Sequence, residues 1–136
     1  MVDVNWIAII IAAVVFNAIG FAWYSDSLFG KKWREESGMS EADFKKGSTN
    51  MNRMFILMTV SSLIMAYVLA VVINVFEATT IAAGLTGAFW LWLGFVATTS
   101  LNSVIYEKKS WMYFGINASF QLVGMLAMGV ILALWV

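Results

Sequence analysis

The chain contains no cysteine, no histidine and no proline, and only 12% of its 136 residues are charged. Without cysteine there are no disulfides and no thiol redox chemistry, which excludes the disulfide-generating class of membrane proteins. Without cysteine and histidine there is no imidazole base, and the usual nitrogen and sulfur ligands of metal sites are absent. Without proline, helices should run without proline kinks. We therefore expect no cofactor and no metal.

Apolar side chains are what the chain has in excess. Hydrophobic residues make up 62% of the sequence, and the mean hydropathy is +0.84. A soluble domain is only about 45–50% apolar, and a chain this short cannot bury the surplus in its own interior. The formal net charge is zero, with no sustained basic face for nucleic acid. The composition predicts an integral membrane protein that binds no nucleic acid.

Four uncharged runs divide the chain, at 4–22, 54–76, 78–106 and 110–136. A helix of about 20 residues crosses a hydrocarbon core of roughly 30 Å, and lipid favours helices because their backbone groups are satisfied internally. Each run is long enough for one such helix and too short for two. The predicted fold is therefore all-α, a single domain over 1–136 with transmembrane spans of about 4–23, 54–76, 79–102 and 112–135.

Lysine and arginine predict the orientation of these spans. All eight lie in the loops 24–53 and 103–111, whereas the opposite side carries only Asp3 and Glu77. The positive-inside rule then places both loops in the cytoplasm and both termini outside. So strong a bias also argues against a dual-topology dimer, which needs nearly balanced charge.

The loop 24–53 contains one helix signal. Ser40-Glu41-Ala42-Asp43 resembles a capping box, and Gly47 is a plausible end of the helix. We expect a short interfacial helix there, with Met39 and Phe44 facing lipid or the bundle. The mixed charges of this loop are typical of a solvated connector, although a docking surface is also possible.

Small residues on each span predict where helices touch, because close approach and interhelical hydrogen bonds drive helix association in lipid. The predicted packing residues are Gly20, Ser62, Ala66, Ala70, Gly84, Gly87, Gly94, Thr98, Gly115, Ser119 and Gly124. Such faces are common in membrane helices. On the simplest interpretation they only hold together the bundle or a homo-oligomer.

A few side chains suggest more than packing. Trp90 lies in mid-span between Gly87 and Gly94 and needs a partner for its indole N–H, whereas Trp92 should point toward lipid. Asn17, Asn117 and Gln121 fall in the predicted cytoplasmic half of the membrane. They could line a vestibule with Trp90 as its floor, because polar groups in a membrane often mark a pathway. A layer of interhelical hydrogen bonds explains them equally well.

No span contains Asp, Glu, Lys, Arg, His or Cys, so acid–base catalysis and proton coupling have no evident carrier. We therefore expect no enzyme. Two classes of function stay open. The favoured one is a membrane scaffold or accessory protein, homo-oligomeric, that binds lipid or a membrane partner. The alternative is a small oligomeric channel or permease for a neutral or anionic solute.

Two segments resemble the domain of unknown function 1761 family. The first motif comprises Trp23-Tyr24-Ser25, Leu28-Phe29-Gly30 and Trp33. The second comprises Tyr106-Glu107 and the stretch Phe114-Gly115-Ile116-Asn117-Ala118 with Gln121, Gly124 and Gly129. Asp26 departs from the pattern, since members often carry proline after the first three residues. The resemblance implies a small four-helix protein of the bacterial inner membrane, of unassigned activity and without catalytic residues to carry over.

The predicted topology can be tested by cysteine labelling. In intact cells, an impermeant thiol reagent should label Asp3→Cys and a cysteine added after Val136, but not Lys45→Cys, because lysine and arginine are retained on the cytoplasmic side. Labelling of Lys45→Cys from outside would contradict the orientation. Equal labelling from both sides would indicate dual topology.

Overall fold

The computed structural model describes residues 3–38, 42 and 51–135. Four helices are long and apolar enough to cross a membrane: α1 (Trp6–Trp23), α4 (Met51–Val75), the span Ile81–Ile105, and α8 (Trp111–Leu134). The third span is built from α5 (Ile81–Leu91), the π-helical η1 (Trp92–Ala97), α6 (Thr98–Ser100) and α7 (Asn102–Ile105). The architecture is all-α, and these four helices indicate a multi-pass membrane protein.

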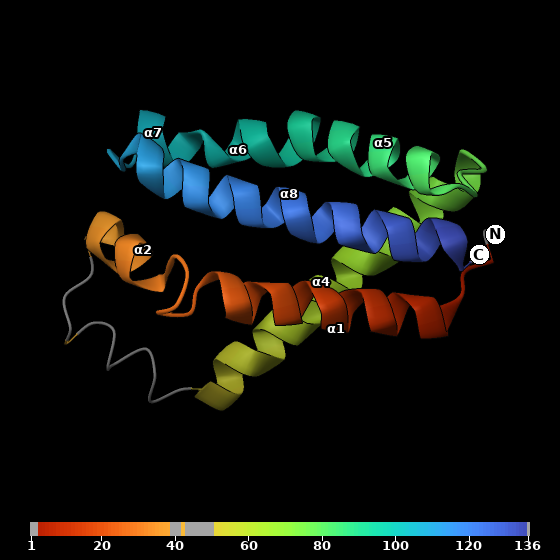
Figure 1. Ribbon diagram of the computed structural model, residues 1–136, viewed down its shortest axis with the longest axis horizontal. Coiled ribbons are helices and arrows are strands. Elements are labelled where there is room, and N and C mark those ends of the chain that lie inside the picture. Colours follow the sequence, from red (N-terminus) through yellow and green to blue (C-terminus); the bar gives the residue numbers. More distant parts are fainter. Residues whose placement is uncertain (1–2, 39–41, 43–50, 136) are drawn as a thin grey trace.

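The helices are arranged around α8. In Figure 1, α8 runs between α1 on one side and α5–α7 on the other, and α4 crosses them diagonally. Asn5 donates a hydrogen bond from Nδ2 to the carbonyl oxygen of Trp135 at 3.3 Å, so the two ends of the described chain meet. The helices α2 (Gly30–Ser37) and α7 lie at the opposite end. Which side of the membrane each end faces stays a prediction.

Glycine brings α5 and α8 into backbone contact. A Cβ atom on Gly84 would lie 2.5 Å from the carbonyl oxygen of Gly129, and one on Gly129 would lie 2.6 Å from that of Gly84. Neither position has room for a side chain. Ala88 and Ala133 fill the space beside this contact. The two helices can approach this closely only because both positions are glycine.

Phenylalanine and glycine interlock α1 with α8. The Phe16 ring covers Gly124, where a Cβ would lie 2.5 Å from the ring, and the Phe120 ring covers Gly20, where a Cβ would lie 3.1 Å away. The two rings also touch each other, with centroids 4.9 Å apart. Each helix therefore supplies one large residue and one gap.

The remaining predicted packing residues divide into two groups. Ser62, Ala66 and Ala70 are buried on α4 against the bundle. A Cβ on Gly87, Gly94 or Gly115 would meet nothing within 4 Å, and Thr98 and Ser119 are exposed. Within the chain, those five positions do not form close helix contacts.

The π-helical segment η1 changes which side of the third span faces α8, so Gly94 and Thr98 do not extend the contact face that begins at Gly84. Up to Trp92 the face toward α8 follows Gly84 and Ala88 at four-residue spacing. The wider π turn then rotates the face by about one residue. As a result Ala97, five residues after Trp92, is buried, whereas Phe95 is 70% exposed.

Trp92 corrects one expectation from the sequence. Its indole Nε1 donates a hydrogen bond to the carbonyl oxygen of Ala118 at 2.9 Å, so it faces α8 rather than lipid. Trp90 is 62% exposed and lies edge-on to the ring of Phe89. The prediction expected Trp90 to face a neighbouring helix because it lies between Gly87 and Gly94. The face toward α8 instead runs through Gly84, Ala88 and Trp92.

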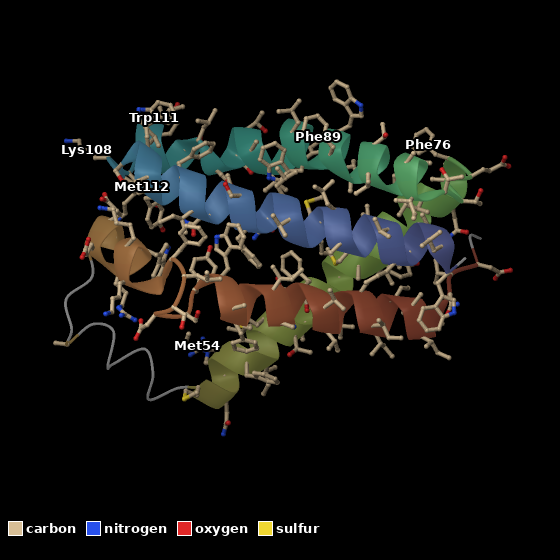
Figure 2. All side chains as sticks on the ribbon, viewed as in Figure 1. Met54, Phe76, Phe89, Lys108, Trp111 and Met112 are labelled. Carbon is tan, nitrogen blue, oxygen red and sulfur yellow. The ribbon has the colours of Figure 1, made fainter. Side chains whose placement is uncertain are left out.

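Helix α4 packs through only part of its length. Its buried residues run from Ser62 to Ile73, whereas residues 51–58 are all exposed. Met54 lies on this exposed half, and Phe76 lies at the other end of the bundle (Figure 2). The first half of α4 therefore leaves space beside α1.

The loop after α1 contains a helix that sequence reasoning did not place. Helix α2 ends at Ser37, and Gly38, which follows it, has a left-handed φ of 73° that suits glycine. The interfacial helix predicted at Ser40–Gly47, with Met39 and Phe44, lies outside the described residues except for Ala42.

The contact between Gly84 and Gly129 can be tested with alanine. We expect Gly84→Ala to lower the free energy of unfolding in mixed micelles by about 1–3 kcal/mol, because its methyl group would overlap the Gly129 carbonyl. Gly87→Ala is the matched control, because it has open space and better helix propensity, and it should cause no loss. Equal unfolding energies for the two variants would contradict the contact.

Candidate functional site

A cavity of about 400 Å³ opens between α1, α4 and α8. Its size lies within the range of about 300–1,000 Å³ typical of ligand pockets. It is lined by Phe16, Asn17, Gly20, Phe21, Tyr24, Met58, Ser61, Phe120 and Gln121. Most of this lining is apolar, with a small number of polar groups and no charged side chain.

Asn17 is held in a fixed orientation in this cavity. Ser62 donates its hydroxyl hydrogen to the carbonyl oxygen of Thr59 at 3.0 Å, so its oxygen is left to accept a hydrogen bond from Nδ2 of Asn17, also at 3.0 Å. Oδ1 of Asn17 must then face the other way, and it accepts no hydrogen bond from the described residues. Asn17 thus fixes the α1–α4 contact and still presents a free acceptor.

Gln121 carries a second unused acceptor. Its Oε1 atom is buried and has no hydrogen-bond partner among the described residues. An unpaired polar atom in a low-dielectric interior costs about 1–3 kcal/mol, so native proteins contain few of them. Gln121 lies on α8 and Asn17 on α1, and both line the same cavity. A molecule with a hydrogen-bond donor could bind to Oδ1 of Asn17, whereas the buried Oε1 of Gln121 has no surface open to the cavity.

An apolar groove adjoins the cavity along α1 and the exposed half of α4. Its volume is about 580 Å³, and it shares Asn17 and Phe21 with the cavity. The other lining residues are Ile10, Ala13, Val14, Ala18, Phe55, Thr59 and Leu63. From Ile10 to Phe21 the groove follows α1 for about 16 Å at 1.5 Å per residue. The cavity and the groove therefore lie side by side along α1, with Asn17 and Phe21 in the walls of both.

A second, polar cavity of about 190 Å³ lies at the loop end of the bundle, between α6–α7 and the start of α8. It is lined by Thr99, Ser100, Asn102, Ser103, Glu107, Tyr113, Phe114 and Asn117. Lys108 and Trp111 lie at this end of the molecule (Figure 2). Its polar side chains suit an interface with water rather than a hydrocarbon interior.

Tyr24 and Asn117 separate the two cavities. The Tyr24 hydroxyl donates to Oδ1 of Asn117 at 2.5 Å, and Tyr24 lines the larger cavity while Asn117 lines the polar one. Tyr24 directly follows α1. Burial, together with the neighbouring Tyr113, raises the pKa of Tyr24 to about 12, so it is a hydrogen-bond donor at neutral pH.

Helix α2 covers this pair from the loop side. Trp33 of α2 meets the Tyr24 ring edge-on at 5.6 Å and stacks on Tyr113 at 6.3 Å, with its buried Nε1 unpartnered among the described residues. Lys109 donates a hydrogen bond to the carbonyl oxygen of Ser37 at the end of α2, where a positive charge is favourable. A hydrogen bond with Ser110, and a second with Lys32, lower the pKa of Glu36.

The family-like motif builds the turn that seats α2 on α8. A Cβ on Gly30 would lie 2.3 Å from the carbonyl oxygen of Tyr24, so this turn requires glycine. Trp23 donates from Nε1 to the carbonyl oxygen of Ile116 at 3.0 Å, and its ring packs on Phe29. Leu28 is 55% exposed and faces outward. Glu107, from the second motif, lines the polar cavity.

The residues proposed for a vestibule are therefore divided. Asn17 and Gln121 line one cavity, and Asn117 lines the other but reaches the first through Tyr24. Trp90 lines neither of these cavities. The sequence analysis named Tyr24 in the family-like motif and not in the vestibule, although its seven-residue spacing from Asn17 puts both on one side of the helix.

The arrangement favours binding over bond chemistry. The larger cavity contains Tyr24 as its one titratable side chain. Among the described residues, no group of three or more acidic side chains lies close enough together to hold a metal ion. The available chemistry is hydrogen bonding to neutral polar side chains, such as Asn17, beside an apolar groove.

The hydrogen bond between Tyr24 and Asn117 can be measured by a double-mutant cycle. Tyr24→Phe should lower the free energy of unfolding by about 0.5–1.5 kcal/mol, and Asn117→Ala should add little once the hydroxyl is gone. Tyr106→Phe is the control, because Tyr106 is 78% exposed and its hydroxyl makes no hydrogen bond to the part of the chain that the structure describes. Fully additive effects of Tyr24→Phe and Asn117→Ala would contradict the bond.

Comparison with known proteins places the chain in one family. No curated protein and no solved structure matches it. The family profile described as "Protein of unknown function (DUF1761)" matches residues 7–133, which includes both motifs and all four apolar helices but for Trp6 and Leu134 at their ends. The chain therefore belongs to the DUF1761 family.

Proposed function

We propose that the protein is a non-enzymatic membrane accessory protein that binds an amphiphilic lipid between α1, α4 and α8. The observation that carries this proposal is that two spaces of different character lie side by side along α1. A cavity with free polar groups at Asn17 and Gln121 shares its wall with an apolar groove of about 580 Å³. A lipid has the same division into a polar headgroup and an apolar chain.

The direction of the groove supports the same ligand. The cavity lined by Asn17 and Gln121 lies toward the loop end of α1, near Tyr24, and the groove extends toward Ile10. With the loops in the cytoplasm, as the positive-inside rule predicts, the headgroup would lie below the inner membrane surface and the chain would extend toward the bilayer centre. Phe21 and Phe55, whose rings stack at 6.5 Å, would contact the chain near the headgroup.

A channel or permease is the second candidate, and the polar cavity at the loop end supports it. The opposite end of the bundle argues against a passage through one chain. There the interior is occupied by buried apolar side chains: Ile9, Ala12, Leu69, Ile73, Met128 and Leu132. A permease would therefore need a passage between copies in a homo-oligomer. We favour lipid binding because it needs only the one chain.

Photo-crosslinking tests lipid binding. The full chain, in lipid nanodiscs, is given a trace of a lipid with a diazirine on its acyl chain, and labelled peptides are mapped. We expect saturable labelling of residues 10–21 and 55–63. Ala18→Trp, which fills the groove, should reduce this labelling about tenfold, the change expected from losing roughly 1.4 kcal/mol of contact.

Ala82→Trp is the matched control, because Ala82 is also an exposed alanine but lies on α5 outside the groove. It should leave labelling of the groove unchanged. Labelling that is spread evenly over all four spans, or that Ala18→Trp and Ala82→Trp change equally, would contradict a lipid site at this position.

A further inference from the structure

We infer that the polar cavity at the loop end of the bundle binds a primary ammonium group, such as the one that ethanolamine carries, either free or as a lipid headgroup. This cavity of about 190 Å³ lies between α6–α7 and the start of α8. It is a different space from the cavity and the groove beside α1, so the inference goes beyond the proposed function and does not depend on it.

Glu107 gives this cavity a negative charge. Among the described residues that line it, Glu107 is the one charged side chain, with no Lys or Arg beside it in the lining. Its carboxylate makes no ion pair with the part of the chain that the structure describes. The neighbouring cations are directed elsewhere: Lys109 donates to the carbonyl oxygen of Ser37 on α2, and Lys108 extends outward from the end of the bundle (Figure 2). The cavity therefore favours a cation over an anion.

Two hydroxyl groups that line the cavity have only acceptor capacity left. Thr99 donates its hydroxyl hydrogen to the carbonyl oxygen of Phe95 at 2.6 Å. Ser103 donates its own to the carbonyl oxygen of Ser100 at 2.8 Å. Because each hydrogen is used within the third span, each oxygen can only accept from a ligand. A primary ammonium group carries three N–H donors, and these two oxygens and the carboxylate of Glu107 supply three acceptors.

The cavity also has donors, which suit a second polar group on the same ligand. Oδ1 of Asn117 accepts from Tyr24, so Nδ2 is its free group, and it donates to none of the described residues. The side chains of Ser100, Asn102 and Tyr113 can donate or accept. These neutral donors cannot offset the repulsion between a carboxylate and a free anion. They can bind the oxygen that ethanolamine, or its phosphate ester, carries two carbons from the nitrogen.

A divalent metal ion fits this cavity less well. Calcium is usually held by six to eight oxygen ligands that include several carboxylates. Here one carboxylate lies among neutral side chains, and no group of three or more acidic side chains that could hold a metal ion occurs among the described residues. An ammonium group needs fewer ligands and only one compensating charge.

Fluorine NMR can detect this binding at the site itself. The full chain, labelled with 3-fluorotyrosine, is placed in phosphatidylcholine nanodiscs, and the Tyr113 signal is identified by its loss in Tyr113→Phe. Ethanolamine is protonated at neutral pH and should shift this signal saturably. Tetramethylammonium has no N–H donor, so it should need about tenfold higher concentration for the same shift.

Two pairs of variants test the contacts. Glu107→Gln should weaken ethanolamine binding about fivefold, a modest factor because this carboxylate is exposed to solvent. Glu77→Gln is its control, because Glu77 is exposed next to Phe76 at the opposite end of the bundle (Figure 2). Thr99→Val keeps the branched shape but loses the oxygen, and should weaken binding about threefold. Thr98→Val is the matched control, because Thr98 also donates to a carbonyl oxygen four residues earlier but does not line the cavity.

Nanodiscs of phosphatidylethanolamine distinguish the two sources of the ammonium group. If the lipid headgroup occupies the cavity, the Tyr113 signal is already shifted in these nanodiscs, and added ethanolamine causes little further change. If the ligand is a free amine, ethanolamine shifts the signal equally in both lipids. Either result supports an ammonium site.

Four results would overturn the inference: no saturable shift in either lipid, equal binding of ethanolamine and tetramethylammonium, an unchanged affinity in Glu107→Gln, or displacement of ethanolamine by sodium or potassium at equal concentration. None of these results affects the photo-crosslinking beside α1. Failure of the ammonium site is therefore distinguishable from failure of the proposed function.

Discussion

Close approach to α8 is the constraint on which the rest of the molecule depends. In lipid, burying an apolar side chain against another helix replaces one hydrocarbon neighbour with another, so packing must come from fit and from hydrogen bonds. Gly84 and Gly129 allow backbone contact on one side of α8, and Phe16 and Phe120 fill the gaps at Gly124 and Gly20 on the other. Trp23 and Trp92 add indole bonds to carbonyl oxygens of α8 only two residues apart, at Ile116 and Ala118.

Helix α4 is the exception, and its position produces the candidate site. It contacts the bundle from Ser62 onward and diverges before that point. The divergence exposes one side of α1, where Asn17 and Phe21 border both the cavity and the groove. A helix that packed along its whole length would close this space. Asn17 and Gln121 therefore line a space that opens where two helices separate.

Composition and charge were enough to predict an all-α membrane protein with four apolar helices, because bilayer thickness and backbone satisfaction leave few alternatives. They could not predict which face of the third span meets α8. The sequence interpretation chose Trp90 because it lies between Gly87 and Gly94, whereas Trp92 continues the face of Gly84 and Ala88 toward α8. Beyond Trp92, the π turn at Trp92–Ala97 shifts the helical register. Helix α2 was missed because it is only eight residues long and is held in part by distant residues such as Lys109. Residue counting grouped Asn17 with Gln121 by depth in the membrane, and both line one cavity. It could not show that Asn117 is kept out of this cavity, because that depends on one side-chain contact with Tyr24.

The most direct test of the account is to locate the lipid. Crystals of the full chain grown with a lipid that carries bromine on its acyl chains would give an anomalous signal at each bromine position. The account predicts a peak in the groove beside Phe21 and Phe55, with headgroup density in the cavity beside Asn17. Bromine peaks confined to the outer surface of α5, with the space beside α1 filled by side chains, would contradict it.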